Sequence, residues 1–341
     1  MTTSFQGDVL RIDASAETEK ITVAIKRFLV DDLKRRGLVV AMSGGIDSSV
    51  VAALCVQAIG KERVLGLLLP EKDSSLDTLR LSRLMAAHLG LDPVIHDITP
   101  LLEASGCYRL QAEAIRTVIP SFGPDWKSKI VLPSVVDTDQ YRIFSVVAMS
   151  PTGAVFKERL SASAYLALVA ATNFKQRIRK MLEYYHGDRL NYAVAGTPNR
   201  LEYDQGFFVK NGDGSADIKP IAHLYKTQVY QLAHVLGVPT EICSRPPTTD
   251  TYSMPQSQEE FYFALPYDKM DLCLYGKNHG VPAADVAPHL GLSAHQVERV
   301  YRDIETKRNT TRYLHRPPLL ADRVPEIEHR SDPPTEASPL Q

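Results

Sequence analysis

Residues 38–49 constrain the fold of this chain more than any other segment. They read Leu-Val-Val-Ala-Met-Ser-Gly-Gly-Ile-Asp-Ser-Ser, an apolar run followed by a glycine- and serine-rich turn and then by a helical pattern. Gly44 and Gly45 can adopt backbone angles closed to other residues, so the N–H groups of the turn can converge on an anion. The N-terminus of the next helix adds partial positive charge. The segment therefore predicts a strand, a phosphate-binding loop and a helix.

The hydroxyl groups and the charge of this loop indicate which kind of phosphate site it forms. Ser43, Ser48 and Ser49 supply hydroxyl donors beside the turn. The loop lacks the lysine of the common G-x-x-x-x-G-K-[ST] pattern and carries Asp47 instead, so a metal ion is expected to neutralise the extra charge. The pattern S-G-G-x-D-S resembles the pyrophosphate loop (PP-loop) of the ATP pyrophosphatases, which split ATP into AMP and pyrophosphate to activate an oxygen for attack.

The segments around this loop alternate between helices and apolar strands. The expected helices are 16–36, 47–59 and 76–89, and the expected strands are 38–43, 63–69 and 93–98. Nearly all-apolar strands with helices between them indicate an α/β fold, in which helices flank both faces of a parallel sheet. This Rossmann-like arrangement is similar to that of the adenine nucleotide alpha hydrolases. Ligands of such sheets bind at the carboxyl ends of the strands, where the loop lies.

The rest of the chain is less regular. Residues 101–160 contain β-branched and aromatic runs separated by turn residues, which favours a β-rich insertion into a domain spanning 1–320. The last residues, 321–341, are rich in Pro, Glu, Asp and Ser and are expected to be disordered. The other expected features are strand-like runs at 129–132, 141–149 and 154–159, helices at 161–185, 225–236, 267–278 and 293–307, a strand at 191–195 and a mobile loop at 241–258.

The composition excludes several classes of protein. With 39 basic and 40 acidic residues among 341, the net charge is −1, so no nucleic-acid or membrane partner is expected. No apolar stretch is long enough to cross a bilayer and the N-terminus lacks a signal-peptide pattern, which predicts a cytoplasmic protein. The four cysteines lack a C-x-x-C pair and are expected to be buried reduced thiols: Cys55, Cys107, Cys243 and Cys273.

A second group of chemically informative residues lies far from the loop, in residues 196–226. Thr197, at the end of an expected strand, can donate to a phosphate. Glu202 opposite Asp47 would complete a magnesium site with two carboxylates, and Lys226 can neutralise the charge of ATP phosphates. The two groups together predict a pocket for a nucleotide and Mg²⁺.

The order and spacing of these motifs resemble those of the NAD synthetase family. Five segments are similar to motifs of that family: N-F-K-Q-R at 173–177, G-T-P-N-R-L-E at 196–202, G-F-F-V-K-N-G-D-G at 206–214, D-I-K-P-I-A-H-L-Y-K at 217–226 and P-T-T-D at 247–250. The resemblance covers about residues 16–100 and 160–315. Several ordered motifs are far harder to meet by chance than one short pattern.

The resemblance implies a role for each matching position. Asp47, Ser48 and Lys226 would be catalytic, and Asp47 and Glu202 would bind Mg²⁺. Contacts to deamido-NAD would come from Arg177, Lys210, Asp217 and His315. ATP would be bound by Ala41, Met42, Ser43, Gly44, Gly45, Ile46, Asp47, Ser48, Thr197, Lys226 and Thr248. Asp213, within Gly-Asp-Gly, is more typical of a turn than of a ligand site.

The activity that the resemblance implies is that of a ligase. It would adenylate the nicotinate carboxylate of deamido-NAD with ATP, release pyrophosphate, and amidate the adenylate with ammonia to give NAD and AMP. Asp217 would attract ammonium. We expect ammonia to be used free or to come from a separate glutaminase. A two-fold homodimer with dinucleotide sites at its interface is also expected, through apolar faces of the helices at 16–36 and 161–185.

Three departures from the family pattern leave alternatives open. Pro198-Asn199-Arg200 and Gln176 replace the residues usual beside the substrate, and residues 101–160 match no family motif. The C-terminal His-Lys pair of the family would fall at His315-Arg316, where Arg is not equivalent to Lys. Amidation of a related carboxylate is therefore one alternative. A tRNA-modifying PP-loop transferase is another, which the balanced charge and the scattered cysteines disfavour.

Overall fold

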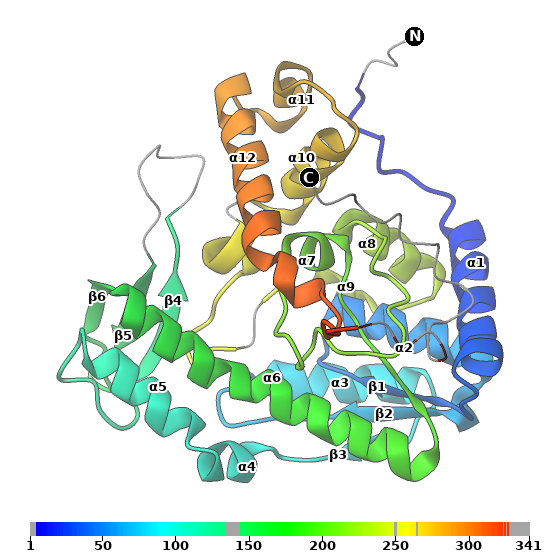
Figure 1. Ribbon diagram of the computed structural model, residues 1–341, viewed down its shortest axis with the longest axis horizontal. Helices are drawn as coiled ribbons and strands as arrows, with labels where there is room; N and C mark the ends of the chain where they lie inside the picture. The colour runs from blue at the N-terminus through cyan, green and yellow to red at the C-terminus, as the bar shows by residue number, and fades with distance from the viewer. Residues whose placement is uncertain are drawn as a thin grey trace.

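A four-stranded parallel sheet forms the centre of the molecule (Figure 1). The computed structural model describes residues 5–133, 144–248, 251–263, 265–322, 324 and 326. The strand order is β3-β2-β1-β7, with β1 (Leu38–Ala41), β2 (Val64–Leu68), β3 (Val94–Ile95) and β7 (Ala193–Ala195). Because β1 pairs with both β2 and β7, the loop after β1 lies at the middle of the carboxyl edge. The predicted α/β class and parallel sheet are confirmed.

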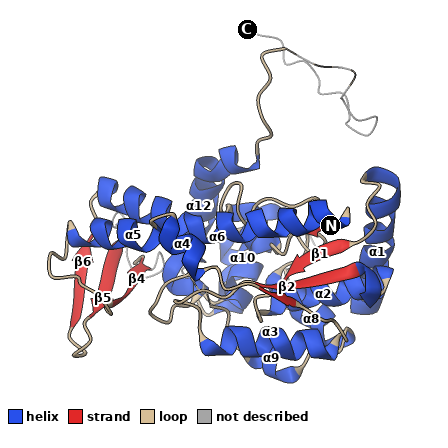
Figure 2. Ribbon diagram, turned by 90° about the horizontal axis from the view of Figure 1, so that it is seen from below, coloured by secondary structure: helices blue, strands red, loops and turns tan. Residues whose placement is uncertain are grey.

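Helices cover both faces of this sheet, and the alternation of side chains along β1 explains how. The covering helices are α1 (Ala14–Arg27), α2 (Ile46–Ile59), α3 (Leu76–His88), α6 (Ala162–Leu190) and α8 (Lys226–Val235). Leu38 and Val40 pack in a buried cluster with residues of α1, α2, α3 and α8. Val39 points to the other face and packs in a cluster with Ile178 of α6. Figure 2 shows α2, α3 and α8 on one side of the sheet and α6 on the other.

Local capping fixes where these helices begin and end. Ser75 Oγ accepts a hydrogen bond from Thr78 N at 3.2 Å at the start of α3. Ser161 Oγ accepts from Ala164 N at 3.2 Å at the start of α6. α6 ends at Asn191, whose φ of 55° lies in the left-handed region. The long predicted helix is therefore confirmed, and it runs five residues further than expected, to Leu190.

The 101–160 segment contains β-strands, as predicted; they form an antiparallel sheet, and two helices precede it. The elements are α4 (Thr99–Ala104), α5 (Cys107–Arg116), β4 (Lys127–Val131), β5 (Ser145–Met149) and β6 (Val155–Arg159), with strand order β4-β5-β6. The β-rich expectation was wrong for the first part, where α5 buries Cys107, Ala114 and Ile115 on one face, a spacing typical of a helix. Residues 134–143 lie outside the described part.

A second group of helices lies beyond the sheet and packs around its own apolar cluster. Its elements are α7 (Arg200–Gln205), η3 (Glu259–Phe263), α10 (Tyr267–Asn278), α11 (Ala283–Leu290), α12 (Ala294–Thr311) and η4 (Arg312–His315). The helices predicted at 267–278 and 293–307 are confirmed. The sequence did not predict α11 because Pro288 lies inside it, and proline is normally a sign that a helix has ended.

Some predicted boundaries differ from the structure. The first helix was expected to reach residue 36, but after Arg27 it widens into the π turn η1 (Phe28–Asp32). The third strand, expected at 93–98, pairs over only two residues. The expected mobile loop at 241–258 begins with α9 (Thr240–Ser244) and buries Tyr252 and Gln256. A short helix, η2 (Lys61–Arg63), precedes β2.

The cysteines and the chain end complete the comparison with expectation. Cys55, Cys107 and Cys273 are buried free thiols as predicted, whereas Cys243 is half-buried. Within the described ranges, no helix has both the length and the apolarity needed to cross a membrane. Most of 321–341 lies outside the described residues, so the disorder of the tail stays a prediction.

Candidate active site

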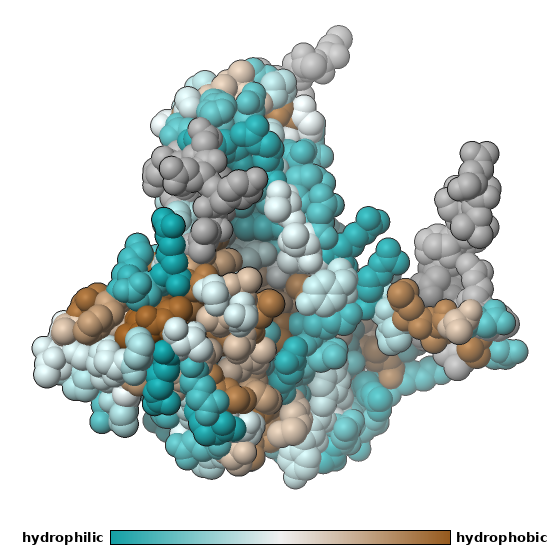
Figure 3. Space-filling model, turned by 60° about the vertical axis from the view of Figure 1, so that its left-hand side comes forward, coloured by the Kyte–Doolittle hydropathy of each residue, from teal (hydrophilic) through white to brown (hydrophobic). Residues whose placement is uncertain are grey.

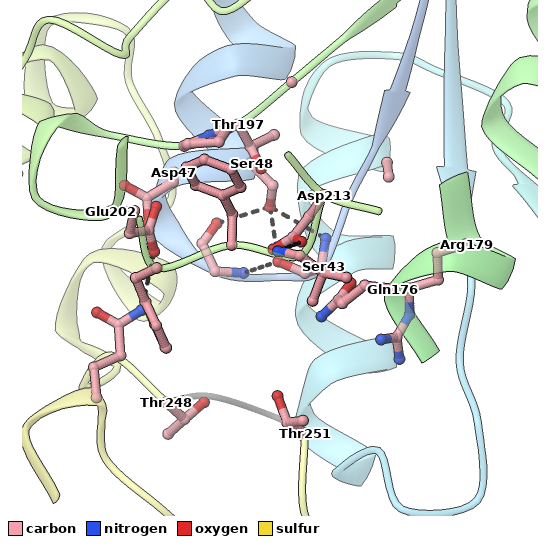
Figure 4. Close-up of a pocket in the computed structure, with 18 of the residues that line it drawn as sticks. Ser43, Asp47, Ser48, Gln176, Arg179, Thr197, Glu202, Asp213, Thr248 and Thr251 are labelled. Carbon is pink, nitrogen blue, oxygen red and sulfur yellow. Dashed lines mark hydrogen bonds between the residues drawn. The ribbon is translucent and has the colours of Figure 1, made fainter. Parts of the chain in front are cut away.

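The loop between β1 and α2 has the backbone geometry of an anion-binding turn. Gly44 has a φ of 71°, and a Cβ at this position would lie 2.7 Å from Thr78 O, so no larger residue fits. Ser43 N donates to Ser48 Oγ at 3.1 Å, and Ser48 Oγ donates to Gly45 O at 3.1 Å. These bonds hold the turn at the N-terminus of α2, where the helix dipole attracts a phosphate (Figure 4).

Asn199 joins the two candidate metal ligands. Its Nδ2 donates to Asp47 Oδ1 at 3.1 Å, and its backbone N donates to Glu202 Oε2 at 3.1 Å. Asn199 Oδ1 in turn accepts from Glu202 N at 3.3 Å, so these two residues form a capping box at the start of α7. Lys226, the first residue of α8, donates to Asp47 Oδ2. Asp47, Glu202 and Lys226, predicted from distant parts of the sequence, thus meet.

The charges of this group are unbalanced. Burial and the neighbouring Asp47 carboxylate raise the pKa of Glu202 above its usual range. Burial acts to lower the pKa of Lys226, but the carboxylates of Asp47 and Glu202 outweigh it and raise that pKa. One buried ammonium group therefore faces two carboxylates, and a further cation would stabilise both in their ionised forms.

Mg²⁺ fits this donor set. It prefers carboxylate oxygens and is usually held by one or two carboxylates together with substrate phosphates and water. Asp47 and Glu202 supply two carboxylates at the edge of a phosphate-binding turn. In the part of the chain that the structure describes, no three His, Cys, Asp or Glu residues gather into a metal-binding group. The arrangement therefore suits a metal ion that also contacts a bound nucleotide.

These residues form one wall of a cavity of about 530 Å³. In Figure 4, Asp47 and Glu202 lie on one side of the cavity, and Gln176 and Arg179 lie on the other. All eleven predicted ATP-binding positions except Gly44 line it: Ala41, Met42, Ser43, Gly45, Ile46, Asp47, Ser48, Thr197, Lys226 and Thr248. The structure therefore brings the predicted nucleotide residues together.

Two of the four residues predicted for deamido-NAD also line the cavity. Arg177 Nε donates to Lys210 O at 3.3 Å, so these two residues lie side by side. Lys210 Nζ donates to Tyr313 O at 2.8 Å and to Arg316 O at 3.2 Å. The C-terminal segment after α12 is therefore attached to the rim of the cavity through Lys210.

Asp217 and His315 do not line the cavity. Asp217 Oδ2 accepts a hydrogen bond from Val194 N at 2.7 Å and so secures strand β7. His315 packs edge-on against Tyr203 and Phe208, with ring centroids 4.8 and 5.1 Å apart. In this structure the two residues stabilise the surroundings of the site, and their predicted contacts with deamido-NAD stay predictions.

Sequence reasoning did not assign the charged residues on the α6 side of the cavity. Lys180 and Glu183 form a buried ion pair at 2.6 Å, and both line the cavity. Asp213 accepts from Val209 N at 2.7 Å, as its predicted turn role requires, but it lines the cavity as well. Burial raises the pKa of Glu183 and of Asp213. Lysine and glutamate three residues apart are typical of an exposed helix face, so no pattern marked this pair as buried.

The amino-acid sequence is similar to those of known proteins. A model of the NAD synthase family matches residues 18–118 and 135–313. The NH3-dependent NAD+ synthetase of Mesorhizobium japonicum is 58% identical over 318 residues, which cover 93% of this chain and 100% of that protein. The NH3-dependent NAD+ synthetase of Thermotoga maritima is 36% identical, over 86% of this chain and 96% of that protein.

Solved structures share the fold. The structure of NMN synthetase from Francisella tularensis superimposes with a TM-score of 0.63 and 22% identity, covering 92% of this chain and 100% of that chain. The NH3-dependent NAD synthetase from Campylobacter jejuni gives a TM-score of 0.59 and 21% identity over the same shares. At these identities the similarity concerns the fold.

Proposed function

The chain belongs to the NAD synthase family, and we propose that it adenylates the nicotinate carboxylate of deamido-NAD with ATP and amidates the adenylate with ammonia to give NAD and AMP. The observation that carries the proposal is the meeting of Asp47, Glu202 and Lys226 beside the Ser-Gly-Gly turn. Relatives that are named NH3-dependent NAD+ synthetases match nearly the whole chain.

The proposed chemistry follows from what a carboxylate requires. Ammonia cannot displace an oxide ion, so the carboxylate oxygen must first attack the α-phosphate of ATP, with pyrophosphate as the leaving group. The mixed anhydride that results contains AMP as a good leaving group, and the lone pair of ammonia then forms the amide as AMP departs. Both steps need charge neutralisation and positioning more than a side-chain nucleophile.

The residues of the cavity divide this work between them. Ser43, Ser48 and the amides of the turn would bind the pyrophosphate part of ATP, and Lys226 would neutralise charge on the reacting phosphate. Asp47 and Glu202 would hold Mg²⁺. When bound, this ion supplies positive charge to the leaving pyrophosphate. Thr197 and Thr248, which line the cavity, would add contacts to ATP.

The source of nitrogen and the location are part of the same proposal. We propose that ammonia enters free or is supplied by a separate glutaminase, since the relatives that match nearly the whole chain are named as ammonia-dependent. A cytoplasmic location fits substrates that are small phosphorylated nucleotides, and we propose it on that ground.

The proposed function is tested by offering the protein ATP, Mg²⁺ and ammonium with a panel of pyridine carboxylates. The panel contains deamido-NAD, nicotinate mononucleotide and nicotinate, and mass spectrometry reads AMP and amide together. We expect deamido-NAD to give the highest kcat/KM. Release of AMP only with one of the other two would overturn the substrate and leave the adenylating chemistry in place.

Arg177→Ala is expected to weaken the binding of deamido-NAD by about 1.5 to 3 kcal/mol, the usual contribution of a charged hydrogen bond. Arg177 lies beside Lys210 in the cavity lining and belongs to α6, whereas the candidate phosphate-binding residues belong to the turn after β1 and to α8, so the KM for ATP should change little. Steady-state kinetics with each substrate varied in turn measures both values. Arg189→Ala, on the same helix but outside the cavity, is the matched control. A rise in both Michaelis constants would contradict the assignment.

We also propose a homodimer that uses the exposed faces of α1 and α6. Val23 and Val30 are exposed near the N-terminus, and α6 exposes Leu166, Met181 and Tyr185. Figure 3, which brings the side bearing the insertion forward, shows apolar surface among hydrophilic residues on that side; α1, at the right of Figure 1, is turned away in this view. Apolar patches on a protein surface commonly mark interfaces.

Light scattering should therefore give twice the chain mass of 37.9 kDa. Met181→Asp, which places a charge in the middle of the exposed face of α6, is expected to shift the protein towards the monomer and to lower activity. The exposed Leu320 provides a control, because Leu320→Asp lies outside both helices. A wild-type monomer with full activity would rule the dimer out.

A further inference from the structure

Lys175 lies at the centre of a largely buried ion cluster behind the cavity wall. Its Nζ donates to Glu71 Oε1 at 2.8 Å, to Asp73 Oδ2 at 2.7 Å and to the carbonyl oxygen of Thr251 at 2.9 Å. The side chains of Lys175 and Glu71 are 0% exposed. Tyr108 of α5 completes the cluster by donating to the second oxygen of Glu71 at 2.7 Å.

The cluster joins two pieces of chain that form walls of the cavity. Glu71 and Asp73 belong to the loop between β2 and α3, which also contributes Pro70 and Ser74 to the cavity lining. Thr251 begins a segment, residues 251–258, that contributes Thr251, Tyr252 and Gln258 to the lining. Lys175 itself does not line the cavity. It therefore acts on the cavity only through the two walls that it connects.

The 251–258 segment reaches the candidate metal site. At its far end, Gln258 Nε2 donates to Glu202 Oε1 at 3.2 Å. Along its length, Met254 N donates to Ser128 O at 3.2 Å, and Gln256 Nε2 donates to Ile130 O on strand β4. The segment thus lies between the Lys175 cluster at one end and a candidate metal ligand at the other, with the insertion sheet supporting it.

The electrostatics of the cluster indicate a positioning role. Burial acts to raise the pKa of Glu71, but Lys175 and the hydrogen bonds around Glu71 lower it below its usual range. Burial and the Glu71 carboxylate raise the pKa of Tyr108, which keeps its hydroxyl proton available for donation. Apolar residues of similar volume are often at least as stabilising as a buried ion cluster. Such a cluster adds positional specificity, because the three hydrogen bonds donated by one Nζ atom fix the positions of three partner groups.

We propose that Lys175 is a positioning residue for ATP, which holds the β2–α3 loop and the 251–258 segment in the arrangement that forms the nucleotide part of the cavity. This proposal depends on the proposed function only in taking deamido-NAD as the substrate that binds together with ATP. Helix α5 contributes through Tyr108. It therefore supports the nucleotide site from behind the cavity wall.

The test separates positioning from stability. Lys175→Met alone leaves two buried carboxylates without a cation and is expected to unfold readily. The decisive variant combines Lys175→Met with Glu71→Gln and Asp73→Asn, which removes all three charges together and keeps an acceptor for Tyr108. Lys175→Arg keeps the charge but cannot place three bonds at a single atom. The triple variant and Lys175→Arg should both fold, with thermal unfolding midpoints within about 5 °C of wild type.

ATP affinity with Mg²⁺, measured by calorimetry without any carboxylate, is the primary readout. We expect the triple variant to bind ATP about ten- to a hundredfold more weakly than wild type, because a small displacement of the walls is costly for a positioned ligand. Lys175→Arg should show a smaller loss. In kinetics the KM for ATP should rise while the KM for deamido-NAD changes less than about twofold, because Arg177 and Lys210 have separate contacts.

The control is an ion pair that joins nearby parts of the chain at the surface. Arg80 of α3 and Glu241 of α9 meet at 2.6 Å with both side chains more than half exposed. Arg80→Met should leave ATP affinity unchanged, as expected for an exposed pair. Wild-type ATP affinity in every folded Lys175 variant would overturn the proposal. A wild-type protein that binds ATP but does not amidate deamido-NAD would overturn the proposed function and leave the positioning test intact.

Discussion

Asp47→Asn is expected to lower the release of AMP by about a thousandfold or more while the protein stays folded. The substitution keeps the size of the side chain but removes one of the two carboxylate charges that would hold Mg²⁺. Asn at this position can still accept a hydrogen bond from Asn199 Nδ2, so the start of α2 should keep its place, but the loss of the ion pair with Lys226 should lower the free energy of unfolding. Quenched-flow or end-point assays of AMP at saturating ATP measure the effect.

Glu202→Gln provides the matched variant on the other side of the metal site. Its amide oxygen can still accept from Asn199 N and preserve the capping of α7, so the helix should form normally. We expect a loss of activity of the same order, with circular dichroism and the thermal midpoint close to wild type. Full turnover in both variants at low Mg²⁺ would sink the metal assignment.

Lys226→Met should have the second large effect, and it should affect stability as well as activity. The Lys226 side chain is 2% exposed and its ammonium group is the partner of Asp47, so its loss leaves a carboxylate in a partly buried site without its cation. Breaking a buried ion pair from one side typically costs about 3 to 5 kcal/mol of unfolding free energy. Activity should fall by about two to three powers of ten, since a charge that would face the reacting phosphate is also lost.

The double variant Asp47→Asn with Lys226→Met distinguishes the two contributions. Removing both partners takes away the unpaired charge. The free energy of unfolding, measured by urea denaturation, should therefore recover much of what Lys226→Met loses. Activity should remain as low as in the single variants, because the cavity then lacks both the metal ligand and the lysine. If restoring stability also restored activity, Lys226 would be a structural residue and its proposed contact with ATP would be wrong.

The sequence predicted those parts of the fold that depend on local signals. The strand, turn and helix around Gly44 follow from apolar character and glycine, and α10 matches its prediction to the residue. Elements with weak local signals were missed. α5 is a short helix of ten residues within a segment whose later part has strand-like runs, and α11 contains Pro288, which is normally a sign that a helix has ended. Their helical state is decided by tertiary packing, which a single sequence does not display.

The candidate site was predictable where a motif carries its own chemistry. Asp47, Glu202 and Lys226 come from three separate motifs, and the structure places them in contact through Asn199 and α8. The roles of charged residues outside these motifs were not predictable. Lysine at 175 and glutamate at 71 are individually ordinary surface residue types, and only the fold shows that they pair in the interior.

The capping box at Asn199 limits which substitutions the G-T-P-N-R-L-E segment can accept during evolution. The interval of three residues between Asn199 and Glu202 is the one that reciprocal capping of a helix requires, so α7 sets this interval independently of any metal. A substitution at Asn199 would disturb the helix start and the bridge to Asp47 together, and a residue at 202 without a side-chain acceptor would remove the reciprocal capping bond. Relatives that differ from this chain at only one of these two positions should therefore be rare. Relatives that differ at Asn199 should also differ at Glu202.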